Sequence, residues 1–309
     1  MSTIQLAIET QLTNLKSNEY FQKIKAMPAT QRWATIAGLF LGSQILVFGF
    51  LYIIFGKIVV IGFLASILAG LATGVGALPA LFFTQISDKL FNSLLGAAAG
   101  VMLAATAFSL LVPGIDAGNQ LWPDKGFLIV AAGLLFGAVF LHLADQRLPH
   151  LHFDSVSKAN QDSLQKIWLF IIAITIHNFP EGMSVGVSFG SGDMKNGIVL
   201  AIAIGLQNIP EGLAVALPLV GLGYNKWKAV GIATLTGLVE PVGGLLGVSM
   251  VTVFTPILPI AMGFAAGAML FVISEEIIPE THSKGRSRFA TFSLIIGFVV
   301  MMSLDNLLS

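Results

Sequence analysis

Long apolar stretches, separated by short segments that carry charged and turn-forming residues, run through the chain from residue 33 to its end. A helix of about 20 apolar residues crosses a bilayer core of about 30 Å. Cutting the sequence at its charged and loop residues predicts nine spans, at about 33–55, 58–84, 91–112, 126–146, 166–190, 196–220, 229–254, 257–279 and 288–307. We therefore predict an all-α polytopic membrane protein with nine transmembrane helices.

The polar segments between these spans predict the domain organisation. Residues 1–32 form an N-terminal segment, residues 33–309 form the transmembrane domain, and residues 147–165 form a loop within it. The first 20 residues are polar and mixed in charge, without the short apolar core and small-residue cleavage site of a secretory signal. We expect no cleaved signal peptide.

Composition supports a membrane protein and excludes several other classes. The chain is 55% hydrophobic and 10% charged, whereas about 25% of residues are charged in ordinary soluble domains. Its formal net charge is zero, so no basic surface indicates a nucleic-acid partner. The absence of Cys removes thiolate chemistry and disulfides.

The positive charges predict the orientation. With a cytoplasmic N-terminus, only three of the 16 Lys and Arg residues, Lys57, Lys125 and Lys195, fall in outer segments, and the other 13 fall in inner ones. Cytoplasmic loops of membrane proteins carry such an excess. We predict a multi-pass protein of the cell inner membrane with the N-terminus inside, the C-terminus outside and the 147–165 loop cytoplasmic.

Three acidic residues, Glu181, Glu211 and Glu240, lie well inside apolar spans. Each carboxylate at the centre of a membrane helix costs about 2.5–3.5 kcal/mol on insertion scales. No Lys or Arg lies at a comparable depth in any predicted span, so protein cations cannot neutralise them. Protonation or a bound metal ion must do so.

The surroundings of two of these glutamates repeat. His177-Asn178-Phe-Pro-Glu181-Gly is followed thirty residues later by Gln207-Asn208-Ile-Pro-Glu211-Gly. Residues at i, i+3 and i+4 share one face of a helix, so each motif places its polar side chains together. If the two faces oppose each other, imidazole, amide and carboxylate groups converge on one polar site within the bilayer.

The prolines in these spans leave two interpretations open. Pro180, Pro210 and Pro241 cannot donate a hydrogen bond to the carbonyl four residues earlier. A carbonyl freed in this way must find another partner in a membrane. That partner is either a bound cation with its water, or a neighbouring Ser or Thr at a simple kink.

Carboxylate and imidazole together favour a borderline divalent metal ion. Zinc, iron(II), manganese and cadmium suit such a site, whereas Mg²⁺ and Ca²⁺ sites are more often all oxygen. The absence of Cys argues against copper(I). We predict zinc or a close relative as the transported ion, and no prosthetic cofactor.

With these motifs and the Glu240-Pro241 pair, the chain resembles the zinc/iron-permease (ZIP) family. The resemblance covers residues 58–309 as an eight-helix core, with 33–55 as an additional N-terminal helix. It implies inward metal transport, a homodimer and an elevator-like movement of a four-helix bundle. It also implies a binuclear centre, with one site formed by His177, Glu181, Gln207 and Glu211 together with Met102, and a second formed by Asn178, Glu181, Asn208, Glu211 and Glu240. Some relatives carry Asp where Asn208 stands, so the second site has one carboxylate fewer here.

Further acidic and histidine residues predict the two mouths of a transport path. Asp116 and Asp305 fall at the outer ends of their spans, where carboxylates would concentrate cations, although ordinary interfacial carboxylates explain them equally well. At the inner side, His-x-His beside acidic residues can hold a metal in transit, with a solvated loop as the alternative. The inner candidates are Asp145, His150, His152, Asp154, Glu275, Glu276, Glu280 and His282.

Other function classes have weaker support. Gly186-Val187-Ser188-Phe189-Gly190 matches the nucleophile elbow of hydrolases, but that motif requires a strand-to-helix turn, and here it ends a predicted membrane helix. Neither the H-E-x-x-H pattern of zinc proteases nor a phosphate-binding G-x-x-x-x-G-K-[ST] loop occurs. We predict a transporter rather than an enzyme, with a metal-selective channel as the main alternative.

Overall fold

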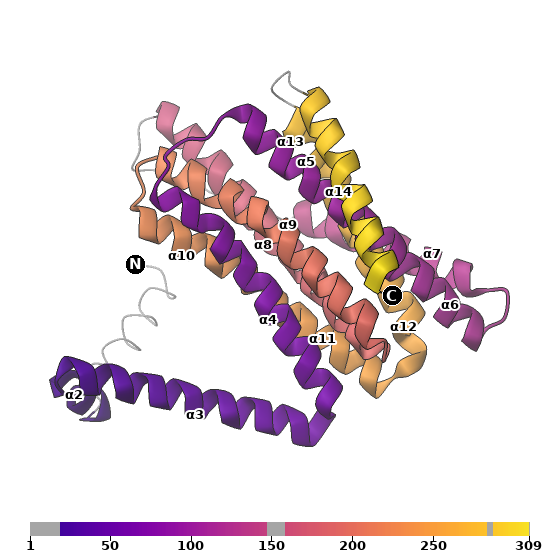
Figure 1. The fold of residues 1–309 in the computed structure, drawn as a ribbon, viewed down its shortest axis with the longest axis horizontal. Coiled ribbons are helices and arrows are strands. Elements are labelled where there is room, and N and C mark those ends of the chain that lie inside the picture. The colour runs from indigo at the N-terminus through magenta and orange to yellow at the C-terminus, as the bar shows by residue number, and fades with distance from the viewer. Residues whose placement is uncertain (1–18, 147–157, 283–286, 309) are drawn as a thin grey trace. The chain divides into compact units, whose positions relative to one another are not determined.

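The computed structural model describes residues 19–146, 158–282 and 287–308, and every element in these ranges is helical (Figure 1). The chain divides into two compact units, residues 1–54 and 55–309. Nine helical stretches in the described residues are long and apolar enough to cross a membrane. The predicted all-α class and the nine spans are therefore confirmed.

The N-terminal unit contains α2 (Glu19–Ala26) and α3 (Ala29–Phe55). The apolar run from residue 36 onward accounts for the length of α3, which begins about one turn before the predicted start of the first span.

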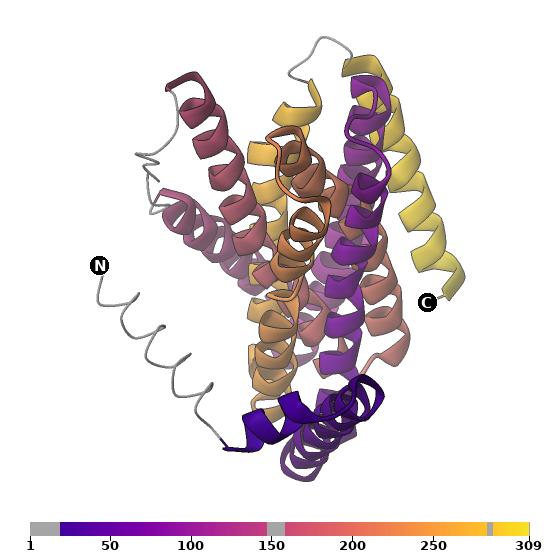
Figure 2. The ribbon, with the colours of Figure 1, turned by 90° about the vertical axis from the view of Figure 1, so that its left-hand side faces the viewer.

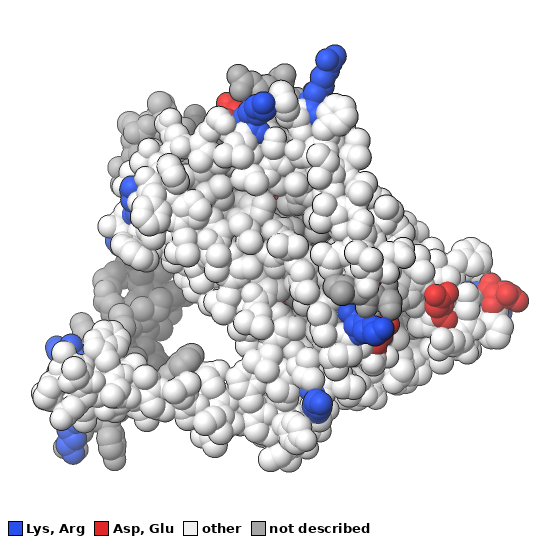
Figure 3. Space-filling model, in the orientation of Figure 1, with Lys and Arg blue, Asp and Glu red and all other residues white. Residues whose placement is uncertain are grey.

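The larger unit holds the other eight spans. Its elements are α4 (Lys57–Ala77), η1 (Leu78–Leu81), α5 (Asp88–Ala105), η2 (Thr106–Leu111), α6 (Val112–Leu121), α7 (Gly126–Gln146), α8 (Lys158–Gly190), α9 (Met194–Gly221), α10 (Lys226–Gly237), α11 (Glu240–Val253), η3 (Thr255–Ile257), α12 (Leu258–Val272), η4 (Ile273–Ile277), α13 (Ile278–His282) and α14 (Ser287–Leu308). Figure 2 shows the long helices of this unit following one common direction. Between the two ends of the bundle, the face in Figure 3 is almost free of charged side chains.

Three spans differ in detail from the sequence prediction. The fifth belongs to α8, which begins at Lys158, within the segment 147–165 that we predicted as a loop. The third is helical to Leu121, whereas we predicted an end near residue 112. Pro113 does not stop this helix because a π-helical segment, η2, precedes it and the proline falls in the first turn of α6, where no donor is needed. The seventh span is broken into α10 and α11, and Glu240 and Pro241 open the second piece.

The helices of the larger unit pack as two groups. The closest pairs are α8 with α11 and α4 with α9 in one group, and α5 with α14 and α7 with α12 in the other. The α10 helix joins the first group through α4, and α6 joins the second through α7. Contacts between the groups run mainly through α9 against α5 and α8 against α12.

Glycines allow the closest of these crossings, as their spacing in lipid-embedded helices favours. A Cβ built on Gly186 would lie 2.1 Å from the carbonyl oxygen of Gly244, and one on Gly267 would lie 1.9 Å from that of Leu134. These backbones therefore approach more closely than any side chain permits.

Candidate metal centre

The three membrane glutamates come together because the glycine after each PE motif lets another helix approach. A Cβ on Gly182 would lie 2.0 Å from the backbone oxygen of Glu240, so α8 meets the start of α11 at this point. A Cβ on Gly212 would lie 1.8 Å from the backbone oxygen of Thr73, so α9 meets α4. In each repeated motif, the glycine sets the helix crossing next to which the preceding glutamate lies.

Hydrogen bonds join the two motifs to each other and to α11. Gln207 Nε2 donates to Glu181 Oε2 (2.8 Å) and to Asn208 Oδ1 (2.6 Å). Asn208 Nδ2 donates to Glu240 Oε1 (2.5 Å) and to the carbonyl oxygen of Ala69 (2.8 Å). The predicted convergence of the motif faces is thus present in the structure, with Asn208 at the point where α4, α9 and α11 meet.

Several polar atoms in this region are enclosed and have no hydrogen-bond partner. They are both side-chain atoms of Asn178, one carboxylate oxygen of Glu211 and one of Glu240. Glu181 and Glu240 are 2% and 0% exposed. An unsatisfied buried polar group costs about 1–3 kcal/mol, and more if it is charged. The unpartnered oxygens among these atoms, on Asn178, Glu211 and Glu240, fit a site that a cation completes.

His177 is held by a residue that we predicted for the inner mouth. Its Nε2 lies 2.8 Å from Glu276 Oε1, and the imidazole is 3% exposed. Glu276 belongs to η4, a π-helical segment, and such segments occur frequently at functional sites. The centre and the predicted exit are therefore in direct contact.

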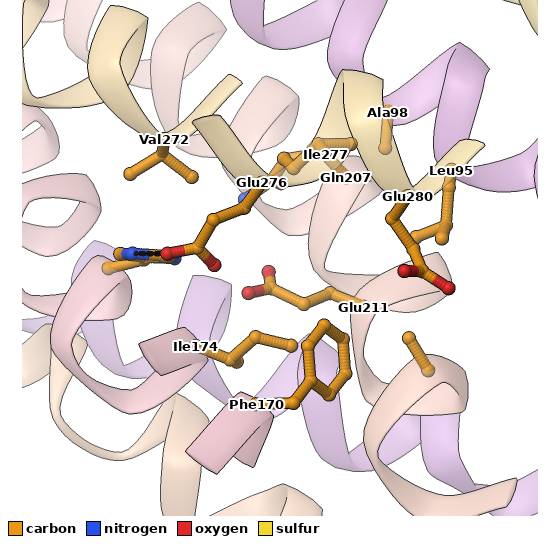
Figure 4. A pocket seen from close by; sticks show the side chains of 12 residues that line it. Leu95, Ala98, Phe170, Ile174, Gln207, Glu211, Val272, Glu276, Ile277 and Glu280 are labelled. Carbon is orange, nitrogen blue, oxygen red and sulfur yellow. Dashed lines mark ion pairs between the residues drawn. The ribbon is translucent and has the colours of Figure 1, made fainter. Parts of the chain in front are cut away.

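A pocket lies between the two helix groups at this contact (Figure 4). Its polar lining comes from His177 on α8, Gln207 and Glu211 on α9, and Glu276 and Glu280 on η4 and α13. Figure 4 shows the carboxylates of Glu211 and Glu276 pointing toward one another. The cavity is about 30 Å³, room for an ion with little water rather than for an organic substrate.

The carboxylates are near one another without forming a finished coordination shell. In the part of the chain that the structure describes, no three His, Asp or Glu side chains are gathered closely enough to hold a metal ion. The amides of Gln207 and Asn208 stand between the carboxylates instead. Metal binding at this site therefore requires side chains to move toward the ion.

Comparison with known proteins places these residues in a family. The model of the ZIP zinc transporter family matches residues 152–305. The zinc transporter ZIPB of Bordetella bronchiseptica is 43% identical over 240 residues, which cover 77% of this chain and 78% of that protein. This chain belongs to the ZIP family. The zinc transporter GufA of Myxococcus xanthus is 43% identical over 250 residues (79% and 97%), and the human zinc transporter ZIP11 is 35% identical over 317 residues (75% and 93%).

The predicted outer mouth of this ZIP protein is arranged differently from the exit. Asp305 is half-buried on α14 and accepts a hydrogen bond from Ser109 Oγ at 2.9 Å. Asn196, buried at the start of α9, donates to the carbonyl oxygen of Ser109 at 3.0 Å. Asp116 is exposed on α6. Asp305 is thus linked to the first helix group through Ser109, which contacts Asn196 on α9.

The remaining residues that we predicted for the site differ in their burial and in their distance from the pocket. Met102 is fully buried in the apolar cluster of α5, α9 and α12. Glu275, beside Glu276, is exposed and does not line the pocket. His150, His152 and Asp154 lie outside the described residues, as do the side chains of Asp145 and His282.

Sequence reasoning missed Ser109, Asn196 and the Ala69 carbonyl. Ser109 lies in the π-helix η2, which no residue pattern indicates, and a backbone acceptor such as Ala69 has no signature in its side chain. Asn196 carries a signal in retrospect, because an amide near the start of an apolar span needs a partner. The G-x-S-x-G match lies entirely within α8 rather than at a strand-to-helix turn, so it does not form a nucleophile elbow.

Proposed function

We propose that this protein carries zinc across the cell inner membrane into the cytoplasm, through the site built by His177, Asn178, Glu181, Gln207, Glu211 and Glu240. Met102 would add a thioether ligand from the opposing helix group. Iron(II), cadmium and manganese are expected as weaker substrates because they suit the same ligand types.

One observation carries the proposal: three glutamates converge in the membrane without a neutralising Lys or Arg. Neither of these residue types occurs at 167–194, 196–225 or 229–253, the stretches that contain all three glutamates. Oxygens of Glu211 and Glu240 are enclosed and unpartnered. A divalent cation would neutralise and coordinate these groups at once, which hydrogen bonds from the protein do not achieve.

The distribution of the site over the two helix groups supports alternating access. The ligand candidates on α8, α9 and α11, together with Ala69 on α4, all belong to one group. The other group contributes Met102 and Glu276. We therefore propose that the first group carries the ion as it slides, in an elevator-like movement, against the second.

The proposed path uses both predicted mouths. Zinc would be gathered at Asp116 and Asp305 on the outer side and handed on at Glu276 and Glu280, next to the centre, on the inner side. Glu275, His282 and the segment with Asp145, His150 and His152 would receive the ion in the cytoplasm. This path follows the inside-positive orientation that the loop charges predict.

Zinc flux into proteoliposomes of purified protein tests the proposal. A carrier saturates at micromolar zinc and is slowed by competing cadmium, iron(II) or manganese in the order of their affinities. A fast flux that rises linearly with zinc concentration would identify a channel instead. No zinc flux above empty vesicles, with the protein inserted, would contradict zinc transport.

Topology and assembly are tested on the same Cys-free chain. Single substitutions Thr3→Cys and Ser309→Cys should be labelled from opposite sides of the membrane, with residue 3 accessible from the cytoplasm. Labelling of both from one side would overturn the predicted orientation. The proposed homodimer should appear as twice the chain mass by light scattering, after subtraction of detergent.

A further inference from the structure

Two amide side chains form a bridge between two buried carboxylates at the centre of the site. The bridge runs from Glu181 through Gln207 and Asn208 to Glu240, with donor–acceptor distances of 2.8, 2.6 and 2.5 Å. Glu181 lies on α8 and Glu240 opens α11, so the bridge spans three elements. It occupies the space in which the ZIP resemblance places a second metal ion.

The orientation of the Asn208 amide follows from its neighbours. Its Nδ2 lies 2.8 Å from the carbonyl oxygen of Ala69, which can only accept a hydrogen bond. The end of the amide that faces Ala69 must therefore be the NH₂ group, and the same group faces Glu240. The Oδ1 end then faces Gln207, whose NH₂ group donates to it and to Glu181.

This orientation directs nitrogen, and not oxygen, at Glu240. An amide nitrogen carries no available lone pair and does not bind a cation, while its N–H groups hold a carboxylate oxygen as a partial positive charge does. Both N–H groups of Asn208 are used, one on Glu240 and one on Ala69. At Glu240 Oε1 the second position thus already has a donor where a cation would otherwise lie, and Glu240 Oε2 alone of this carboxylate is left unpartnered.

We propose that the Asn208 amide takes the place of a second cation, so that the centre binds a single zinc ion around His177, Glu181 and Glu211. This inference rests on the proposed function, since it concerns the same site. Gln207 is a positioning residue in it, because it holds Glu181 and orients Asn208. Asn208 determines how many ions the centre takes.

The substitution Asn208→Asp should reverse the arrangement. A carboxylate at this position would set its oxygens against the Ala69 carbonyl and the Glu240 carboxylate, and like charges at this distance in a buried site are strongly unfavourable. A divalent cation bound between the two carboxylates relieves that repulsion. The variant is therefore expected to bind one more zinc ion than the wild type.

Counting zinc at the centre tests the proposal directly. Zinc bound per chain is measured by elemental analysis after equilibrium dialysis, for each background with and without the paired change Glu181→Gln/Glu211→Gln. The loss caused by the paired change counts ions at the centre and cancels those held by surface residues. We expect a loss of one ion from the wild type and two from Asn208→Asp.

A matched control uses another amide of the same helix. Asn196 is also buried on α9 and also donates to a backbone carbonyl, that of Ser109. In Asn196→Asp the paired change should remove one ion, as in the wild type. A second ion at the centre of this control would show that any added carboxylate increases the count and would overturn the role given to Asn208.

The outcomes separate this inference from the proposed function. A loss of two ions from the wild type would overturn the single-ion centre and leave zinc transport standing. No loss would contradict the proposed function itself. Electron paramagnetic resonance of cobalt-loaded wild type needs no variant: an uncoupled Co²⁺ signal supports the inference, and a magnetically coupled pair contradicts it.

Discussion

The half of the bundle on the predicted cytoplasmic side of the metal centre and the half on the predicted outer side differ sharply. On the inner side, His177, Glu211, Glu276 and Glu280 line one continuous pocket. On the outer side, fully buried apolar side chains from both helix groups fill the space between the centre and Asp305. These side chains are Met102, Ala105, Leu110, Leu200, Ile204, Ala265 and Met269.

The difference shows that polar residues at both ends of a membrane path do not make both ends open. Asp305 and the centre are separated by the apolar cluster, whereas Glu276 touches His177 directly. In the described residues, the pocket at the centre extends to Glu280 on the inner side, whereas buried apolar side chains fill the outer side. This is the arrangement that the proposed alternating-access transport requires of one of its states. In the proposed mechanism, movement of one helix group would open the outer half.

The largest effect is expected from a covalent link that holds the two helix groups together at the outer end. Asn196 and Ser109 belong to different helix groups, and the Asn196 amide contacts the Ser109 backbone. The double substitution Ser109→Cys/Asn196→Cys should therefore form a disulfide or a mercury bridge between α9 and η2. Cross-linking should reduce zinc uptake by at least about 10-fold, because the outer half could no longer open. Transport assays before and after thiol reduction measure this.

Each single Cys variant is the control for that experiment and should transport after the same oxidation. Zinc uptake that continues in the fully cross-linked protein would show that α9 and η2 do not separate at this point during transport.

The second-largest effect is expected at the crossing of α8 with the start of α11, next to the metal centre. Gly182→Ala would place a methyl group 2.0 Å from the backbone oxygen of Glu240, so overpacking should cost about 1–3 kcal/mol of stability. Thermal unfolding in detergent should show a lower midpoint, and zinc uptake should fall as Glu181 and Glu240 are separated.

Gly205→Ala is the control change, because its added Cβ would have its nearest neighbour 3.8 Å away, at the crossing of α9 with α4 in the same helix group. That variant should unfold at or slightly above the wild-type temperature, since Ala favours helix by up to about 1 kcal/mol. Equal unfolding midpoints for Gly182→Ala and Gly205→Ala would contradict the claim that the close backbone approach at Gly182 leaves no room for a methyl group.

A smaller effect is expected on the inner side. In the proposed centre, Glu276 would compete with zinc for His177 Nε2, because a ring nitrogen that is hydrogen-bonded to a carboxylate cannot bind a metal at the same time. Glu276→Gln should therefore tighten zinc binding by roughly 3–10-fold and slow release, within the range for groups next to metal ligands. Calorimetry and turnover measure the two quantities.

The exposed neighbour Glu275 provides the comparison for that change. Glu275→Gln should alter affinity by less than about 2-fold, because its side chain does not line the pocket. Weaker binding in Glu276→Gln would instead make Glu276 a ligand of the bound ion.

The smallest effect belongs to the outer mouth. Asp305→Asn keeps an acceptor for Ser109 but removes the charge, so the KM for zinc should rise about 2–3-fold at low salt and less at high salt. Asp116→Asn, on an exposed residue, should change KM less. Equal shifts in the two variants would mean that both act only as general surface charge.

Much of this architecture could be predicted from the sequence, because lipid imposes simple rules on length and charge. Nine spans, the three glutamates and the facing motifs follow from hydropathy and helical periodicity. The sequence also pointed to Glu276, but not to its contact with His177, since the two lie on spans far apart in the chain.

The remaining features depend on geometry that side-chain types do not encode. A π-helix changes the register by one residue without a sequence signature, so the continuation of the third span past Pro113 was missed. The acceptors at Ala69 and Ser109 are backbone carbonyls, which every residue has. The orientation of Asn208, on which the ion count depends, follows only from that contact.

Zinc uptake by Glu211→Gln tests the central claim most directly. Glu211 stands in the pocket with an enclosed, unpartnered carboxylate oxygen, and the amide keeps its shape while removing its charge. In proteoliposomes that contain equal amounts of folded protein, saturable uptake by the wild type should fall at least about 100-fold in this variant. Uptake by Glu211→Gln at the wild-type rate would contradict transport through this centre.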